Sequence, residues 1–569
     1  MTFDRAANIR RLSSESFDVL VVGGGITGTG VALDAVSRGL RTALVEKGDF
    51  ASGTSSKSSK LVHGGIRYLQ QKEVGLVYEA LAERQILRRT APHLVRVLPF
   101  LLPVFTKDGL LPRRIARLLG ATMWAYDLTG GLRIGKLHKR VSKEDALRYM
   151  PTLPADNIAA SYIYYDAQAD DARLTLTVAK TAASFGAAVV NYAALTGIVK
   201  DAGERVRGAR VRLDGDEIEV QTRTVVNATG VWSDEIRALD DEDHTTTIRP
   251  AKGIHITVPW ELVRNEIAVV IPVPKDRRSV FVVPWGGEGG PHRFTYIGTT
   301  DTDYDGPVDD PQITAADVEY LLRAINGAST TRITEADIVG TWAGLRPLVA
   351  AAKSERTADL SRRHSVHRSP AGVVTVTGGK LTTYRRMAAD AVDEVVDLLG
   401  RGGGSRTKRI ALQGADGWDS PGIPRNLAER YGSDGLAVAA LEHSDATLSR
   451  TLIESLPYSR AEVVYAARAE MAMSVDDVLS RRTRARLLAR DASAAVADDV
   501  ASLLARELGW SEAERAGQVA RYRGVIAAER QAGGLPETAL DALSHHPADS
   551  VVSPGANEPG HPDSSDRVR

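Results

Sequence analysis

The sequence predicts an α/β plus α+β fold: a doubly wound dinucleotide-binding part, interleaved with an antiparallel-sheet part and followed by an all-helical C-terminal domain. Three observations carry this prediction. An apolar strand runs into a glycine turn and a helix within the first 50 residues. Strand-like runs dominate 250–300, and apolar residues recur at helical spacing over 413–532.

Length and composition bound the class of protein. The 569 residues correspond to about three or four domains. Lys+Arg and Asp+Glu are both 72, so the net charge gives no reason to expect nucleic acid as a partner. Cysteine is absent, which excludes disulfides, thiolate metal sites and cysteine nucleophiles, and we expect no metal site. That absence suits the cytoplasm, and no signal peptide or membrane span is expected.

The expected domain organisation follows from changes in composition along the chain. Arg401–Ser405 is a glycine-rich break, and the last residues are rich in Pro, Asp, Ser and Gly. The expected units are an N-terminal leader (1–15), a core (16–395), a linker (396–412), a helical domain (413–532) and a largely disordered tail (533–569). Within the core, we assign cofactor binding mainly to 16–90, 160–235 and 335–395, and the substrate part mainly to 91–159 and 236–334.

A dinucleotide-binding motif opens the core. Gly23, Gly25 and Gly28 have G-x-G-x-x-G spacing, with a strand before them and a helix after them. The first glycine permits the tight turn, the second lets the backbone approach a pyrophosphate, and the third lets helix and strand pack closely. Glu46 ends the next strand, where its carboxylate can accept both hydroxyls of an adenosine ribose. The motif predicts an adenine dinucleotide without deciding between FAD and NAD.

Two further features favour FAD. A hydroxyl-rich stretch after Glu46 offers partners for a second phosphate or a ribityl chain, and the turn 227–230 lets the backbone pass close to the same cofactor. Each feature alone also suits an ordinary loop or strand end. The residues that we expect to bind the cofactor are Gly23, Gly25, Gly28, Glu46, Thr54, Ser55, Ser56, Ser59, Lys60, Ala228, Gly230, Asp301, Gly379, Lys380, Leu381 and Thr382.

Five runs of sequence resemble a known family, the FAD-dependent, respiratory-type glycerol-3-phosphate dehydrogenases. The runs are TSSKSSKLVHGGIRYL (54–69), AKGIH (251–255), IGTTD (297–301), GLRPL (344–348) and GGKLTTYR (378–385). A weaker likeness covers 468–483. The resemblance implies a fold like that of D-amino-acid oxidases, non-covalent FAD, glycerol 3-phosphate as substrate and a quinone as electron acceptor. A homodimer is among the assemblies that we expect.

By similarity, six residues line the substrate pocket: Arg67, Tyr68, His255, Arg346, Arg362 and Lys380. The sequence around Arg362 departs from the family pattern, and Arg363 could take its place. A phosphate dianion favours planar, bidentate arginine donors, so Arg346 and Arg362 or Arg363 are phosphate candidates, with Arg67 beside them.

The reaction also needs a base, because the C2 hydroxyl must lose a proton as hydride leaves C2. His255 is the first choice, although its strand also suits a packed sheet histidine. Lys380 is the alternative base, or stabilises negative charge on the alkoxide or the flavin. We therefore take His255, Arg346 and Lys380 as the catalytic residues. An oxidase that reduces oxygen on the same scaffold, or a flavin-binding regulatory module without turnover, are the alternative functions.

The segment 97–140 predicts contact with a membrane. It combines a cationic cluster (Arg113, Arg114 and Arg117) with an apolar run, Val97–Phe105, that Pro99 and Pro103 interrupt. An amphipathic helix packed on its own domain gives a similar pattern. Because a quinone lies in the bilayer, we predict monotopic attachment through 97–140 to the anionic inner face of the cell membrane. Localisation is then cytoplasmic and peripheral.

Overall fold

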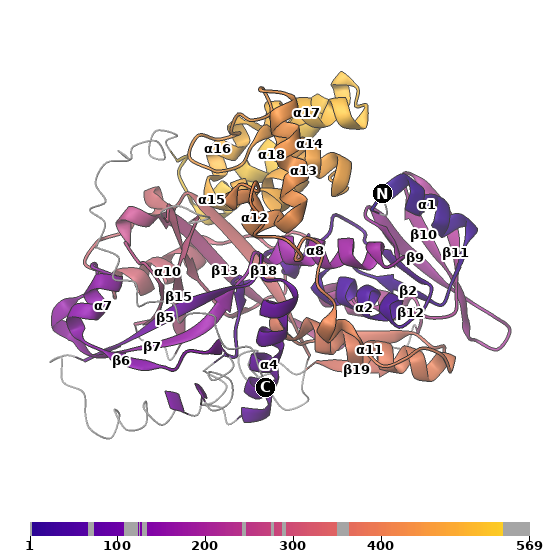
Figure 1. The fold of residues 1–569 in the computed structure, drawn as a ribbon, viewed down its shortest axis with the longest axis horizontal. Coiled ribbons are helices and arrows are strands. Elements are labelled where there is room, and N and C mark those ends of the chain that lie inside the picture. Colours follow the sequence, from indigo (N-terminus) through magenta and orange to yellow (C-terminus); the bar gives the residue numbers. More distant parts are fainter. Residues whose placement is uncertain are drawn as a thin grey trace, which may run out of the picture.

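The computed structural model describes residues 3–65, 73–106, 123–124, 126–127, 134–241, 246–274, 278–286, 292–349 and 364–538. Within these ranges the chain forms three β-sheets, helices that cover them and a C-terminal group of helices (Figure 1). The predicted fold class is confirmed.

The six-stranded sheet carries the predicted dinucleotide-binding unit. Its strands, in spatial order, are β19 (Ser365–Arg368), β20 (Val374–Thr377), β12 (Val225–Asn227), β2 (Val19–Val22), β3 (Thr42–Val45) and β8 (Ala188–Val190). All pairs are parallel except β19 with β20. Both faces are covered, which is why β2 and β3 read as continuous apolar runs.

Helices cover one face of this sheet. They are α2 (Ile26–Ser37), α8 (Asp171–Ser184) and α11 (Tyr384–Leu399), which share one apolar core with β2, β3 and β8. The other face packs on a four-stranded sheet of β1 (Ser16–Phe17), β11 (Asp216–Thr222), β10 (Val206–Leu213) and β9 (Ala193–Lys200).

The segment 1–15, expected as a polar leader, contains the helix α1 (Arg5–Ser14). Leu12 is buried in the core between the two sheets, and the buried Asn8 side chain donates a hydrogen bond of 3.1 Å to the carbonyl of Val189 in β8. Four residues separate these inward positions, so they lie on one face of the helix. Polar composition hid this face, because only one of the two residues is apolar.

A large, mostly antiparallel sheet forms the second half of the core. Its strands are β17 (Thr302–Asp303), β13 (Ile248–Pro259), β16 (Phe294–Gly298), β15 (Ser279–Trp285), β14 (Ala268–Pro272), β5 (Arg96–Phe105), β7 (Ile158–Gln168) and β4 (Leu61–Val62), with β18 (Gly340–Val349) on β13 and β6 (Lys139–Val141) on β7. One face carries α7 (Lys143–Tyr149) and α10 (Ala315–Asn326). The other face packs against α4 (Val74–Thr90) and the C-terminal helices.

The expectation that Val97–Phe105 is a shallow membrane anchor is wrong. The run forms β5 inside the large sheet, paired along its length with β7, and Phe100 and Leu101 also pair with β14. Phe100 and Leu101 are buried. Pro99 and Pro103 fit here because the short pairing with β14 does not include them. Arg113, Arg114 and Arg117 lie outside the described residues.

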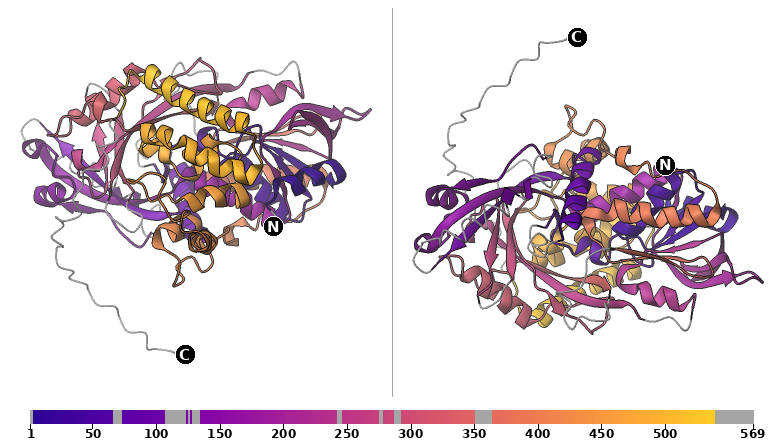
Figure 2. Two further views of the ribbon diagram at one scale, coloured as in Figure 1. Left: turned by 90° about the horizontal axis from the view of Figure 1, so that it is seen from above. Right: turned by 90° about the horizontal axis from the view of Figure 1, so that it is seen from below.

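The C-terminal helices lie together above the junction of the two sheet systems (Figures 1 and 2). They are α12 (Arg425–Tyr431), α13 (Gly435–Ser444), α14 (Arg460–Ala469), the π-helical turn η11 (Asp477–Arg482), α15 (Ala485–Leu488), α16 (Arg490–Ala495), α17 (Ala497–Leu508) and α18 (Glu512–Gly533). They share one apolar core with the large sheet, so the two parts pack as one body.

The remaining short helices lie in connections between these elements. They are η1 (Thr54–Ser56), η3 (Ala155–Asn157), η4 (Gly230–Trp232), α9 (Ser233–Ala238), η5 (Trp260–Leu262), η6 (Glu335–Asp337), η8 (Leu381–Thr383), η9 (Thr407–Arg409) and η10 (Gly432–Asp434). Four of them, η1, η4, α9 and η8, border the site described next.

Candidate active site

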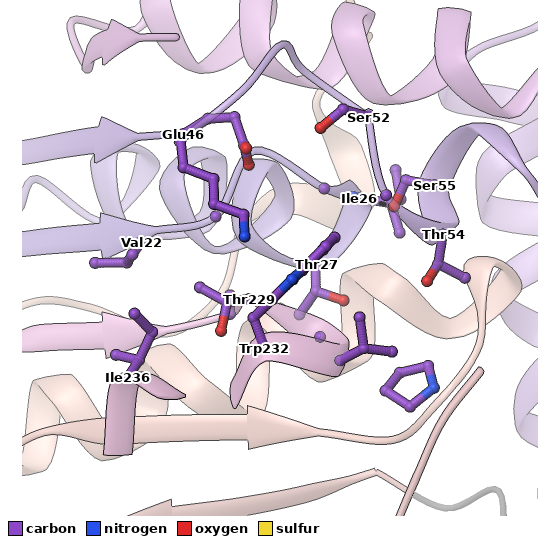
Figure 3. Close-up of a pocket in the computed structure, with 18 of the residues that line it drawn as sticks. Val22, Ile26, Thr27, Glu46, Ser52, Thr54, Ser55, Thr229, Trp232 and Ile236 are labelled. Carbon is purple, nitrogen blue, oxygen red and sulfur yellow. Dashed lines mark hydrogen bonds between the residues drawn. The ribbon is translucent and has the colours of Figure 1, made fainter. Parts of the chain in front are cut away.

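A pocket opens where the parallel strands β2, β3 and β12 end, which is where ligands bind in open α/β sheets. In Figure 3, Ser52, Ser55 and Glu46 lie on one side of the start of α2, and Trp232 and Ile236 lie on the other. Ten of the sixteen residues expected to bind the cofactor line the pocket: Gly23, Gly25, Glu46, Thr54, Ser55, Ala228, Gly230, Gly379, Lys380 and Leu381.

The three motif glycines have the geometry that the motif requires. Gly23 has φ +110°, and a Cβ there would lie 2.7 Å from the carbonyl oxygen of Ala228. A Cβ on Gly28 would lie 1.9 Å from the carbonyl oxygen of Gly23. At Gly25 a Cβ would meet only the Ser55 hydroxyl, at 3.0 Å, so this position faces the pocket. The turn therefore fits a pyrophosphate that approaches the start of α2.

Glu46 follows β3 with both carboxylate oxygens already placed. Its Oε2 accepts a hydrogen bond of 2.6 Å from the amide of Gly24, and its Oε1 accepts one of 2.8 Å from the amide of Gly48. Burial raises the pKa of this carboxyl, and the two N–H donors oppose that shift. Each oxygen keeps a second lone pair, so the geometry also fits a ribose diol.

The hydroxyl-rich segment and the opposite wall are fixed by hydrogen bonds. Ser55 Oγ accepts from the amide of Ile26, 2.9 Å away, in the first turn of α2. Across the pocket, Trp232 Nε1 donates to Asp309 at 2.9 Å, and the Lys47 ammonium lies 4.3 Å from the Trp232 ring centre. Trp232 and Lys47 line the pocket, yet they were absent from the predicted site.

Six of the predicted cofactor residues do not line this pocket: Gly28, Ser56, Ser59, Lys60, Asp301 and Thr382. Gly28 lies behind the glycine turn, and Thr382 Oγ1 accepts from the amide of His63 at 3.1 Å. Ser56 and Lys60 are buried under the hydroxyl-rich segment that follows Glu46. The Lys60 ammonium there pairs with Asp171 at 3.0 Å. Ser59 and Asp301 instead contact two predicted substrate residues.

His255 is buried on β13, and its ring is fixed on three sides. It stacks on Trp342 with ring centres 4.6 Å apart and planes 9° apart. Its Nε2 lies 2.9 Å from Ser59 Oγ, and Gly298 packs so closely that a Cβ there would meet the ring at 2.1 Å. Burial, with the charges of Lys60 and Arg346, lowers the pKa of His255 well below its usual range. The imidazole is therefore neutral at neutral pH.

Arg346 lies beside His255 because β18 pairs with β13. Its guanidinium passes over Gly253, where a Cβ would lie 2.5 Å from Nη2, and residues 253 and 255 share one face of the strand. Asp301 holds Nη1 at 2.8 Å, and Nη2 donates to the carbonyl of Thr300 at 3.1 Å. A carboxylate and a carbonyl thus orient this arginine next to the histidine.

Lys380 belongs to the nucleotide pocket. It lies directly after Gly378 and Gly379, both at positive φ, and it lines the nucleotide pocket. Arg67, Tyr68, Arg362 and Arg363 lie outside the described residues, so the structure does not test their placement. Among the described residues no group of three His, Asp or Glu side chains could hold a metal ion.

Comparisons with known proteins identify the family. The model of the FAD dependent oxidoreductase family matches residues 18–385, and that of the C-terminal domain of alpha-glycerophosphate oxidase matches 394–515. "Glycerol-3-phosphate dehydrogenase 2" of Mycobacterium tuberculosis is 41% identical over 552 residues, covering 94% of this chain and 92% of its own. The human mitochondrial glycerol-3-phosphate dehydrogenase is 36% identical, covering 91% and 74%.

A solved structure agrees with these matches. The glycerol-3-phosphate dehydrogenase of Bacillus halodurans, complexed with FAD, superposes with a TM-score of 0.74 at 30% identity and covers 94% of this chain and 98% of its own. The chain belongs to the FAD-dependent glycerol-3-phosphate dehydrogenase family. Its cofactor is FAD, as the sequence predicts. An L-alpha-glycerophosphate oxidase of Mycoplasma pneumoniae, at 19% identity and a TM-score of 0.51, shares the fold.

Two residues that contact the predicted site residues were not predicted from the sequence. Trp342 packs flat on His255, and Asp171 binds Lys60 at the start of α8. The only sequence signal for Asp171 is an Asp170–Asp171 pair at the junction of a strand and a helix. That pattern is typical of an N-cap, and Asp170 does cap α8.

Proposed function

We propose that this chain oxidises sn-glycerol 3-phosphate to dihydroxyacetone phosphate with bound FAD and passes the electrons to a membrane quinone. One observation carries the substrate assignment: a neutral, buried His255 and a charged Arg346 lie side by side on β13 and β18. An alcohol that bears a phosphate needs such a pair, a proton acceptor beside an anion-binding group. Relatives at 36–41% identity carry the name of this activity.

Each catalytic group has a defined role in this proposal. Bound FAD would supply the acceptor for the hydride of C2. His255 takes the proton of the C2 hydroxyl as the carbon–oxygen double bond forms, so two electrons and one hydrogen leave carbon and one proton leaves oxygen. Arg346 binds the phosphate, with Arg67 and Arg362 or Arg363 as further candidates. Lys380 balances negative charge at the pocket.

The proposed membrane contact omits β5 from the predicted segment 97–140, keeps the later part of that segment and adds the exposed face of α4. Among the described residues, four of the seven large apolar side chains that are exposed lie between 74 and 137: Val74, Tyr78, Trp124 and Leu137, each 44–53% exposed. Val77 and Leu81 on the inner face of α4 share a core with Met123 and Tyr126, so α4 and 123–127 adjoin. In the described ranges no helix has the length and apolar character to cross a bilayer. We propose peripheral attachment through this surface to an anionic cytoplasmic membrane face.

The substrate proposal is tested by a paired assay with a soluble dye as acceptor. Wild-type protein should form dihydroxyacetone phosphate, and Arg346→Ala should lower kcat/KM for glycerol 3-phosphate by roughly 10–100-fold, the value of one charge-assisted contact. Turnover of glycerol, which lacks the phosphate, should change by less than about threefold. Equal losses for both substrates would mean that Arg346 does not recognise phosphate. Hydrogen peroxide formed at the rate of turnover in air, without quinone reduction, would assign oxygen as the acceptor.

A further inference from the structure

Ser59 occupies one of the two ring nitrogens of His255. Ser59 Oγ lies 2.9 Å from Nε2, and within the described part of the chain Nδ1 has no hydrogen-bond partner. A neutral imidazole carries one proton. If Nδ1 is to take the proton of the substrate, Nε2 must carry the ring proton and donate it to Ser59 Oγ. The Ser59 hydroxyl can accept that proton, so its position orients the ring of the proposed base and leaves Nδ1 for the substrate.

Ser59 is held in turn by its neighbour Ser58. The carboxylate Oδ2 of Asp171 accepts hydrogen bonds from the Ser58 amide, at 2.9 Å, and from its hydroxyl, at 2.7 Å. The Ser58 carbonyl accepts from Trp342 Nε1 at 3.1 Å, and the Ser59 carbonyl accepts from the Tyr296 hydroxyl at 2.9 Å. The backbone on both sides of the Ser59 side chain is thus fixed by buried partners.

Asp171 is itself shared between the two parts of the molecule. Its Oδ1 binds the Lys60 ammonium at 3.0 Å and the guanidinium of Arg484, which comes from the C-terminal domain. Arg484 Nη2 also donates to the carbonyl of Ser56 at 2.9 Å. The side chains of all three charged residues are at most 2% exposed. The guanidinium of Arg484, more than 400 residues away in sequence, therefore helps to hold the segment that carries Ser59 in place.

The backbone at this cluster supports a specific role. Lys60 has φ 56° and Arg484 has φ 63°, a left-handed conformation that side chains other than glycine rarely adopt. Such conformations persist where the surrounding contacts over-determine them, and they gather at functional sites. The two residues with this conformation, Lys60 and Arg484, bind the same carboxylate, that of Asp171.

We propose that Arg484 is a positioning residue for the reaction: through Asp171 it holds Ser58, and so keeps Ser59 against Nε2 of His255. The C-terminal domain thereby contributes to proton transfer without touching substrate or cofactor. This inference rests on the proposed role of His255 as the base. It gives the C-terminal domain a role in catalysis, which the match of that domain to a family does not provide.

A merely structural role of Arg484 is the competing explanation, and Arg430 provides the matched control. Arg430 makes a comparably buried ion pair with Glu462, 6% and 0% exposed, inside the C-terminal domain. Its guanidinium donates to the carbonyl of Asn426 on its own helix and to the Glu462 carboxylate in α14. Arg484→Gln leaves Lys60 on Asp171, so the carboxylate keeps one cation and the variant should fold.

The test is a double-mutant cycle on the rate of anaerobic flavin reduction by glycerol 3-phosphate. Arg484→Gln and Ser59→Ala should each slow the limiting rate by about 10–100-fold at full FAD content, and Arg484→Lys should recover part of the loss. The double variant should be no more than about twofold slower than Ser59→Ala, because both changes break one chain of contacts. Arg430→Gln should lower Tm but leave the rate within about twofold, and its effect should multiply with that of Ser59→Ala.

Two results would overturn the proposal: a wild-type rate in Arg484→Gln, or losses that multiply between Arg484→Gln and Ser59→Ala. If Arg484→Gln does not fold, Ser58→Ala replaces it, since this change removes the bond of the Ser58 hydroxyl to Asp171 without altering the C-terminal domain. Additivity with Ser59→Ala would then be the contradicting outcome. A different result would show that the proposed function itself is wrong. In that case the flavin of His255→Ala would be reduced at the wild-type rate.

Discussion

At the scale of single residues, the sequence predicts those positions whose role depends on their immediate neighbours. Gly23, Gly25 and Gly28 carry their geometry in their spacing, and the structure places them as the motif requires. Ser59 and Lys60 were expected to bind the cofactor because they lie in a hydroxyl-rich loop. Their partners, His255 and Asp171, lie more than 100 residues away, which local pattern cannot reveal. The roles proposed for the site residues stay predictions.

The glycine motif gives a prediction about cofactor content. Gly28→Ala should yield protein without bound FAD, because even a methyl group would lie 1.9 Å from the carbonyl oxygen of Gly23. Gly524→Ala is the matched control, since a Cβ there, on α18, meets nothing within 4 Å. The ratio of flavin to protein absorbance measures the outcome. Stoichiometric FAD in Gly28→Ala would contradict the assigned turn.

His255 gives a prediction about pH. Its pKa is lowered well below the usual value by burial and by the charges of Lys60 and Arg346. The base is active when neutral, so lowering the pH should not slow flavin reduction until well below pH about 6.5, the value of free imidazole. Stopped-flow measurement of the flavin reduction rate at a series of acidic pH values tests this prediction. A loss of rate centred near pH about 6.5 would argue against a buried histidine as the base.

At the scale of elements, hydrophobic patterning predicts the first strands and helices, but it does not always show where in the fold a segment lies. The helix expected after the glycine turn is α2, and the strand expected directly before Glu46 is β3. Patterning failed at β5, where an apolar run with two prolines resembled an anchor. Only its pairing with β7 and β14, strands that lie later in the sequence, makes it a core strand.

The outer face of α4 yields a prediction about membranes. Tyr78→Glu with Trp124→Glu should release the protein from vesicles that contain anionic lipid and lower quinone reduction, because both changes place charge on exposed apolar positions. Activity with a soluble dye should stay within about twofold. Leu436→Glu is the control, an exposed apolar position on α13. Unchanged co-sedimentation of the double variant would place the contact elsewhere.

At the scale of the whole molecule, buried ion pairs join the C-terminal domain to the core. The Asp49 carboxylate, after β3, binds Arg481 and Arg482 in η11, each at 2.7 Å. Burial alone would raise the pKa of Asp49, but Arg482 and Arg481 hold it below its usual range. The stabilisation is therefore present above pH about 4 and is lost as the pH falls further. The sequence predicts a separate helical domain, while these pairs and the shared core make it part of one body.

Asp49→Asn should accordingly destabilise the whole protein by about 1.5–3 kcal/mol, since both guanidinium groups lose a charged hydrogen-bond partner, although Arg481 keeps Asp476 and Asp477 and Arg482 keeps Glu470. Asp498→Asn removes a carboxylate that is 53% exposed and pairs with Arg515 and Arg523, and should cost no more than about 1 kcal/mol. Thermal unfolding of both variants, with FAD at saturation, gives the comparison. Equal Tm values for the two variants would deny the Asp49 cluster a role in joining the domains.

The central claim, that this site oxidises glycerol 3-phosphate by means of its flavin, is tested most directly by one spectrum. Purified protein is titrated anaerobically with sn-glycerol 3-phosphate, and the visible absorption band of bound FAD is followed. The account predicts full bleaching with about one equivalent of substrate, because each molecule delivers two electrons, and much slower bleaching with glycerol at the same concentration. A band that stays unchanged with glycerol 3-phosphate, yet is bleached by dithionite, would contradict it.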